Sequence, residues 1–170
     1  MREGISRIKL VLFDVDGVLT DGRIYIDNNG VESKAFDVKD GHGLKLLQRA
    51  GFRVGLITGR QSRVVEHRAE ELGIGLIFQG VTEKLPVFER IARELHLEDE
   101  EIAYMGDDLV DLPVLRRAGI SATVADACEE VKPEVDFVAS RAGGRGAVRE
   151  FCELLLKESG RWSEVFSRYS

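Results

Sequence analysis

Cysteine, proline and tryptophan are scarce in this sequence, with 2, 3 and 1 residues among 170. Cys128 and Cys152 stand at no spacing typical of a metal-binding or redox pair, so we expect two reduced thiols, with a structural disulfide as the open alternative. A chain of this size buries about 70% of its unfolded surface and forms a core without disulfides. The sequence therefore predicts one globular domain over residues 1–170.

Long apolar runs are also missing. No stretch approaches the ~18 apolar residues that span a bilayer, and residues 1–10 contain no apolar core of a signal peptide. We therefore expect a cytoplasmic protein with no membrane partner. Basic residues are fewer than acidic ones, 24 against 30, which gives a net charge of -6. Because a nucleic-acid groove needs a positive surface, nucleic acid is not expected as the main partner, although a local basic patch is compatible with this balance.

Short apolar runs recur along the chain, and each ends in a polar or glycine-rich loop. Since they lack strict alternation, they are typical of strands buried on both faces. The runs are residues 8–13, 54–57, 76–78, 102–105, 120–124 and 137–138. Segments of helical period lie between them, at 43–50, 62–72, 82–95 with Thr82 as N-cap, and 147–156. This alternation predicts an α/β fold, a doubly wound Rossmann-like parallel sheet with helices on both faces.

One segment departs from the alternation. Residues 23–26 and 31–36 are typical of two strands around a turn at 27–30. A β-hairpin has no place in a crossover between parallel strands, so we expect it to project from the sheet as a flap over about residues 23–36. Its apolar residues either cover the core or form an interface. An isolated two-stranded flap is marginal in water, which makes the interface the sharper hypothesis.

Polar side chains follow the predicted strands, at the edge where an open α/β sheet binds its ligands. They are carboxylates, one hydroxyl and one ammonium: Asp14, Asp16, Thr58, Lys84, Asp107, Asp108 and Asp111. Converging carboxylates repel one another, and a Mg²⁺ ion bound together with a substrate phosphate relieves that repulsion. Lys84 and Thr58 suit a phosphoryl group, and backbone N–H groups around Gly17 add donors. The pattern indicates metal-assisted phosphoryl transfer with an aspartate as nucleophile.

These residues resemble the four motifs of the haloacid dehalogenase-like phosphatases. The motifs are Asp14-Val15-Asp16-Gly17-Val18-Leu19-Thr20, Thr58-Gly59, the isolated Lys84, and Gly106-Asp107-Asp108-Leu109-Val110-Asp111. The resemblance implies that Asp14 attacks phosphorus, and that Asp16 protonates the leaving oxygen and later activates water. It implies Mg²⁺ held by Asp14, the backbone carbonyl of Asp16, and Asp107. It implies Thr58 and Lys84 as phosphoryl holders, and Asp108 and Asp111 as residues that orient the metal and Lys84.

Further segments resemble one family of that superfamily, the 3-deoxy-D-manno-octulosonate 8-phosphate (KDO 8-phosphate) phosphatases. They are residues 21–25, a predicted loop at 37–41, 57–60, and the glycine-rich entry to the last helix, 143–150. The resemblance implies a small-molecule sugar phosphate as substrate and a place in lipopolysaccharide sugar synthesis. The family's substrate contacts map to Asp37, Val38, Lys39, Asp40, Gly41, Lys45, Arg60, Arg68 and Lys84. A guanidinium at Arg60 or Arg68 suits the carboxylate of a sugar acid.

Other functions stay open at this point. Related phosphatases for nine-carbon sialic-type sugar acid 9-phosphates carry Glu where Arg60 stands and Lys where Glu71 stands. Phospho-receiver signalling modules also combine an acidic pair, Thr and Lys around Mg²⁺. They place a phospho-accepting Asp after the third strand, where this chain has Gln79-Gly80. An inactive domain serving assembly is disfavoured, because every expected catalytic residue type is present.

The chain leaves little room for a cap domain over the site. Only 43 residues separate Asp14 from Thr58, and 25 separate Thr58 from Lys84. Neither gap holds more than the hairpin, so the site must either take a macromolecule or borrow a wall from a neighbouring subunit. The acidic balance and the sugar-phosphate resemblance favour the second. We therefore expect a homo-oligomer, a tetramer joined through the hairpins. The tail after Ser159, about 159–170, is a candidate to reach a neighbour's site.

Overall fold

Six parallel strands form one sheet in the computed structural model, which describes residues 4–169. The order of the strands in the sheet is β5-β4-β1-β6-β7-β8. Their bounds are β1 (Leu10–Phe13), β4 (Arg53–Ile57), β5 (Leu76–Phe78), β6 (Ile102–Met105), β7 (Ile120–Thr123) and β8 (Phe137–Val138). Every neighbouring pair in this sheet is parallel, which confirms the predicted α/β fold.

The order of the strands distinguishes the phosphatase hypothesis from the receiver hypothesis. Counted along the chain, the six strands lie in the order 3-2-1-4-5-6, which is the order of the Rossmann fold. Receiver domains have the order 2-1-3-4-5, with the first strand beside the third. Here β1 pairs with β4 and β6, which are the second and fourth strands of this sheet when counted along the chain. The receiver hypothesis is therefore wrong for this chain.

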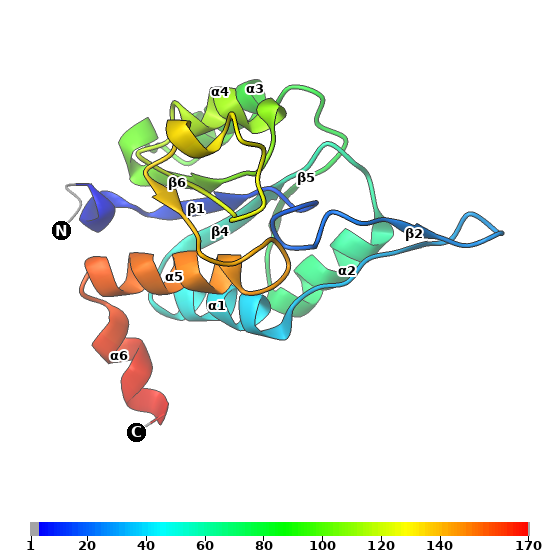
Figure 1. The fold of residues 1–170 in the computed structure, drawn as a ribbon. Helices are drawn as coiled ribbons and strands as arrows, with labels where there is room; N and C mark the ends of the chain where they lie inside the picture. Colours follow the sequence, from blue (N-terminus) through cyan, green and yellow to red (C-terminus); the bar gives the residue numbers. More distant parts are fainter. Residues whose placement is uncertain (1–3, 170) are drawn as a thin grey trace.

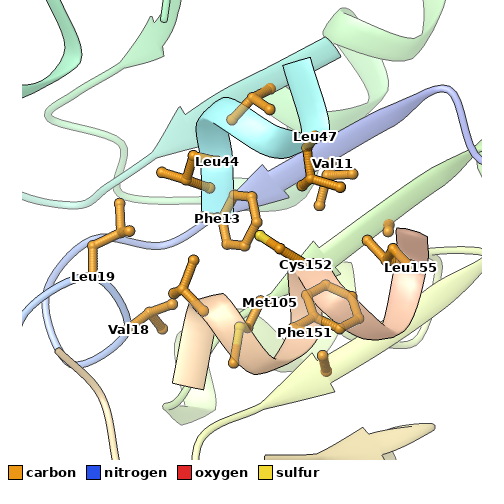
Figure 2. Close-up of a cluster of buried hydrophobic side chains, with 14 of the residues drawn as sticks. Val11, Phe13, Val18, Leu19, Leu44, Leu47, Met105, Phe151, Cys152 and Leu155 are labelled. Carbon is orange, nitrogen blue, oxygen red and sulfur yellow. The ribbon is translucent and has the colours of Figure 1, made fainter. Parts of the chain in front are cut away.

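Helices cover both faces of the sheet (Figure 1). On one face lie α1 (Val38–Arg49), α2 (Arg63–Leu72) and α5 (Ala147–Glu158), and on the other lie α3 (Lys84–Glu94) and α4 (Leu112–Leu115). The central strand β1 supplies both cores, because successive side chains of a strand point to opposite faces. Val11 and Phe13 pack on the side of α1 and α5, as Figure 2 shows, and Leu10 and Leu12 pack on the side of α3 and α4.

Two helices begin at residues other than those predicted. α1 begins at Val38, because Asp37 Oδ1 accepts the backbone N–H groups of Lys39 (2.6 Å) and Asp40 (3.2 Å) and so caps the helix. The predicted loop at 37–41 is therefore wrong, since these residues form the cap and first turn of α1. α3 begins at Lys84 with Glu83 as its N-cap, so the Thr82 cap is also wrong.

The sequence analysis did not predict α4 and α6 (Trp162–Phe166), which are too short to show a helical period. Several 3₁₀ turns also connect the main elements. They are Ile5–Arg7, Asp99–Glu101, Leu109–Asp111, Lys132–Glu134 and Ser167–Tyr169.

A separate antiparallel pair lies outside the main sheet, between β2 (Tyr25–Ile26) and β3 (Glu32–Ser33). Asp27 Oδ1 accepts the N–H groups of Asn29 and Val31, both at 2.8 Å, and closes the turn. The pair extends away from the two helix layers in Figure 1. Its strands are shorter than predicted, and its use as a flap or an interface stays a prediction.

The last described residues pack on their own chain. The Tyr169 hydroxyl lies 2.9 Å from His42 Nε2 and accepts a hydrogen bond from Arg49 Nη1 at 2.6 Å, and both partners belong to α1. Ser170 lies outside the described residues. Entry of this tail into a neighbour's site stays a prediction.

Residues 4–169 also show the state of the two cysteines and the apolar length of the helices. No helix there is long and apolar enough to cross a bilayer. Cys128 and Cys152 are free thiols, so the predicted reduced state is confirmed and the disulfide alternative is wrong. Cys152 lies on α5 inside the core drawn in Figure 2, where burial raises the pKa of its thiol well above the usual range.

Candidate active site

Three neighbouring strands end in functional side chains at one edge of the sheet. β1 is followed by Asp14, β4 by Thr58, and β6 by Gly106 and Asp107, while Lys84 reaches the same place from the start of α3. The pocket at this edge has a volume of about 400 Å³, which suits a small molecule. Its lining residues are Asp14, Asp16, Thr58, Gly59, Arg60, Val81, Thr82, Lys84, Asp107, Asp108 and Val110. The structure therefore brings the predicted nucleophile, phosphate and metal residues together.

A buried lysine bridges two carboxylates in this pocket. Lys84 Nζ lies 2.9 Å from Asp14 Oδ1 and 2.7 Å from Asp111 Oδ1, and all three residues are buried. Burial by itself would lower the pKa of Lys84, but attraction by the two carboxylates outweighs burial, so the pKa is raised. Lys84 is therefore a fixed positive charge in the pocket at neutral pH.

Asp111 is held by donors on both of its oxygens. Oδ1 accepts the hydroxyl of Tyr104 at 2.5 Å as well as Lys84, and Oδ2 accepts the backbone N–H groups of Asp107 (3.0 Å) and Asp108 (3.2 Å). These four donors use the acceptor sites of a carboxylate. Asp111 thus contacts both Lys84 and the 107–108 backbone, and its role in orienting Lys84 stays a prediction.

Asp108 is placed differently. Its carboxylate accepts the N–H of Leu109 at 2.7 Å and caps the 3₁₀ turn that follows, and the residue as a whole is exposed at the pocket mouth. The contact of its side chain with a metal or with Lys84 stays a prediction.

The buried Asp14 and the half-buried Asp107 have carboxyls with raised pKa values. Burial, together with repulsion from Asp111, raises the pKa of Asp14 to about 6, although Lys84 opposes the rise. Burial, together with repulsion from Asp14, raises the pKa of Asp107 to about 8. Asp107 Oδ1 is buried and has no hydrogen-bond partner in the described part of the chain. An oxygen in this state is suited to a hard divalent cation.

The geometry of the carboxyls also fits a metal ion. One oxygen from each of Asp14, Asp107 and Asp111 lies within 4.8 Å of the other two. Because Asp111 is already occupied by donors, Asp14 and Asp107 are the better ligands. Gly17 makes the approach of Asp107 feasible, since a Cβ at residue 17 would lie 2.0 Å from Asp107 Oδ2. The Gly17 N–H donates to Thr20 Oγ1 at 3.3 Å, and its predicted phosphate contact stays a prediction.

Asp16 contacts a residue that the sequence analysis missed. Lys34, just after β3, places Nζ against Asp16 Oδ1, and the Lys34 side chain is fully buried. Glu32, two residues earlier, lies 3.8 Å from Lys34 Nζ. Alternate residues of a strand share one face, so the charged alternation at 32 and 34 was the available signal.

Arg60 is the one predicted carboxylate-binding arginine that lines the pocket within residues 4–169. Its Nη2 donates to Glu32 Oε2 at 3.0 Å, and Ser62 Oγ donates to Glu32 Oε1 at 2.5 Å. The hydrogen bond from Ser62, followed by Arg60 and Lys34, lowers the pKa of Glu32. The hairpin is therefore connected to the pocket rim through Glu32 and Lys34.

Of the predicted substrate residues, Arg60 and Lys84 line this pocket, and the others lie away from it in a single chain. Asp37, Asp40, Gly41 and Arg68 surround a small hollow beside α1 and α2, and Lys39 faces a second hollow beside α5. Arg68 donates to Glu71 Oε2 (2.8 Å) and to the Asp37 carbonyl (3.3 Å). Val38 is exposed on the first turn of α1, and Lys45 is half-buried on the same helix. Their contact with substrate stays a prediction.

Asp40 has a structural partner instead. Its buried carboxylate accepts the N–H groups of Gly146 (3.1 Å) and Arg149 (2.8 Å) at the start of α5. The glycine-rich run before α5 in turn supports the loop after β1, because the Gly144 N–H donates to the Val18 carbonyl at 2.9 Å. A Cβ at Gly143 would lie 1.8 Å from the Gly17 carbonyl oxygen.

The chain is similar to known phosphatases over most of its length. The sequence model of the haloacid dehalogenase-like hydrolase family matches residues 39–119. The 3-deoxy-D-manno-octulosonate 8-phosphate phosphatase KdsC of Escherichia coli (strain K12) is 47% identical over 160 residues, which cover 94% of this chain and 85% of the relative. This chain belongs to the KdsC family of haloacid dehalogenase-like hydrolases.

Two solved structures of this family superpose closely on the chain. The enzyme of that name from Moraxella catarrhalis, in complex with a magnesium ion, a phosphate ion and KDO, has a TM-score of 0.96 and 41% identity, and the match covers 99% of this chain and 97% of that one. The cobalt-bound phosphatase from Haemophilus influenzae has a TM-score of 0.91 and 40% identity, with 96% and 99% covered. Membership of the KdsC family confirms the predicted resemblance and the hydrolase class.

Proposed function

We propose that this protein is a Mg²⁺-dependent phosphomonoesterase that hydrolyses KDO 8-phosphate to KDO and phosphate. The observation that carries the proposal is the cluster of the buried Asp14 and Lys84 with the half-buried Asp107 at the carboxyl edge of the sheet. The identity with KdsC of Escherichia coli supports the choice of substrate. The proposal includes a cytoplasmic place in lipopolysaccharide sugar synthesis.

The chemistry follows from the two aspartates after β1. A carboxylate oxygen of Asp14 attacks phosphorus, the bond from phosphorus to the sugar oxygen breaks, and Asp16 gives its proton to that leaving oxygen. The product is an aspartyl-phosphate on Asp14. Asp16 then takes a proton from a water molecule as the water attacks phosphorus, which releases phosphate and restores the Asp14 carboxylate.

Two pocket residues are suited to the phosphoryl group during both steps. Lys84, beside Asp14, supplies a positive charge, and the buried Thr58 supplies a hydroxyl donor. Fixed donors of this kind stabilise the charge that develops in the transition state.

Asp14, Asp107 and the backbone carbonyl of Asp16 would hold the metal ion. The unpartnered Asp107 Oδ1 and the raised pKa values of Asp14 and Asp107 support this assignment. A bound Mg²⁺ would offset the negative charge of the phosphate and of these carboxylates.

The proposal also includes a homotetramer joined through the hairpins. Within one chain the pocket holds Arg60 and Lys84, while the other predicted substrate contacts lie around α1 and α2. A neighbouring subunit could bring its own copy of these contacts, or its tail, to the open side of the pocket. The exposed Tyr25, Ile26 and Val31 on the hairpin supply the apolar surface that such an interface needs.

Phosphate release from a panel of esters tests the proposal. The panel contains KDO 8-phosphate, a nine-carbon sugar acid 9-phosphate and simple sugar phosphates, each with Mg²⁺. We expect the highest kcat/KM with KDO 8-phosphate and no turnover by the Asp14→Asn variant. Higher kcat/KM with the nine-carbon ester would favour the alternative substrate, and equal rates on all esters would overturn the substrate assignment. Activity of Asp14→Asn within tenfold of the unaltered protein would overturn the nucleophile.

A further inference from the structure

The Lys34 side chain is fully buried, although several other residues of its hairpin are exposed. This side chain is 0% exposed, while Tyr25, Ile26 and Val31 of the same hairpin are 52%, 64% and 58% exposed. A lysine is seldom buried without a charged partner. The burial of Lys34 therefore points to its contact with the pocket rather than to the packing of the hairpin.

The partner of Lys34 is the Asp16 carboxylate, and the two oxygens of that carboxylate differ. Oδ1 accepts the hydrogen bond from Lys34 Nζ. Oδ2 is buried and has no hydrogen-bond partner among residues 4–169. One oxygen is thus fixed by Lys34, and the other is left for proton transfer.

We propose that Lys34 is a positioning residue for Asp16: by holding Oδ1, it directs Oδ2 toward the leaving oxygen of the substrate. This inference rests on the proposed phosphomonoesterase function. Each of the two aspartates after β1 then contacts a different lysine, Asp14 contacting Lys84 and Asp16 contacting Lys34. Lys34 comes from the hairpin, so the hairpin contributes to the chemistry of its own chain.

A purely structural role for Lys34 makes a different prediction. The hairpin is already connected to the pocket rim by Glu32, which contacts Arg60 and Ser62. If Lys34 were only one more such connection, its loss would slow the hydrolysis of every ester equally. If Lys34 positions Asp16 as the general acid, the loss of activity on replacing Lys34 depends on the leaving group of the ester. A sugar alkoxide needs a proton as it departs, whereas 4-nitrophenolate departs without one.

The experiment compares two substrates in one preparation of each variant. We measure kcat/KM for KDO 8-phosphate and for 4-nitrophenyl phosphate with the unaltered protein, Lys34→Met and Lys34→Arg. The ratio of the two values does not depend on the fraction of folded enzyme, because the enzyme concentration cancels. General acid catalysis contributes about 10²–10⁴-fold, so we expect Lys34→Met to lower the ratio at least about tenfold. Lys34→Arg keeps a cationic donor and should restore most of the ratio.

Lys84→Met is the matched control. Lys84 holds the phosphoryl group, which both esters share, so this change should slow both reactions and leave the ratio within about threefold. An unchanged ratio in Lys34→Met, with turnover of KDO 8-phosphate by the unaltered protein, would overturn the role of Lys34 alone. If the unaltered protein hydrolysed neither ester, the proposed function would be overturned and this inference with it.

Discussion

Lys84 Nζ lies 2.9 Å from Asp14 Oδ1 in a pocket wall from which solvent is largely excluded. The pair is not isolated, since Asp111 Oδ1 lies 2.7 Å from the same nitrogen. One ammonium therefore serves two carboxylates, and Asp107 is left with a raised pKa and a free oxygen. A bound cation would offset this local excess of negative charge and would allow a phosphate ester to bind beside it.

Removal of the Lys84 charge should slow catalysis strongly. We expect Lys84→Met to lower kcat/KM for KDO 8-phosphate by about 10³-fold or more, since fixed charges at a reacting group are worth about 10²–10³ each and Lys84 also orients Asp14. Phosphate release measures the effect. Lys132→Met, which removes a lysine from a surface ion pair with Glu129, should stay within twofold. Comparable losses in both variants would contradict the assignment.

The metal-free protein should lose stability as the pH rises from about 4 to about 8. The folded-state pKa values of Asp14 and Asp107 are raised from 3.8 to about 6 and about 8. The stability that these protonated carboxyls contribute is present below about pH 4 and is lost as the pH rises through the two raised values. We expect the Tm in EDTA to fall over this interval, measured by differential scanning fluorimetry.

Mg²⁺ should reverse that loss, because the cation replaces the protons on these carboxyls. The rise in Tm on adding Mg²⁺ should be larger at pH 8 than at pH 6. Asp107→Asn removes the group with the higher pKa and should flatten both dependences. An equal rise in Tm at the two pH values would speak against a site made from these residues.

Tyr104 should contribute to stability through Asp111. The Tyr104 hydroxyl is fully buried and donates to Asp111 Oδ1 at 2.5 Å. Tyr104→Phe keeps the ring and removes this donor, which should lower the free energy of unfolding by about 1–3 kcal/mol, as for other hydrogen bonds to charged groups. Urea denaturation measures the loss. Tyr25→Phe, at a side chain 52% exposed, is the control and should change little.

Gly143 should tolerate no side chain. A Cβ there would lie 1.8 Å from the Gly17 carbonyl oxygen, a backbone atom of the catalytic loop. We expect Gly143→Ala to destabilise the fold by about 1–3 kcal/mol and to lower kcat by moving Asp16 and Gly17. Gly75→Ala is the control, because nothing lies within 4 Å of its Cβ and its φ is not in the left-handed region. Equal Tm and kcat in the two variants would show that the 143–146 run does not support the loop.

The hairpin should be needed for assembly. We expect light scattering to give a tetramer for the unaltered protein and a smaller species for Ile26→Glu, which places a charge on the most exposed of its apolar side chains. Val138→Glu, on the edge strand β8, should leave the assembly intact. A monomer at working concentration of the unaltered protein would remove the basis for a shared site.

Several features were predictable from the sequence because local patterns carry them. Buried strands appear in the sequence as short apolar runs. The residue after each strand must lie at the carboxyl edge of a parallel sheet. The sequence alone therefore predicts that Asp14, Thr58 and Asp107 lie close together. The cap at Asp37 was misread because capping depends on one side chain rather than on a period.

The sequence by itself determined the fold class, the order of the motifs and the identity of the charged residues that line the pocket. Only the tertiary structure decided which charges meet: Lys34 with Asp16, Glu32 with Arg60, and Asp40 with the start of α5, 106 residues along the chain at Gly146. Such contacts join segments that are distant in sequence and have no local signature. They form because a buried charge is costly without a partner, and packing settles which partner is within reach.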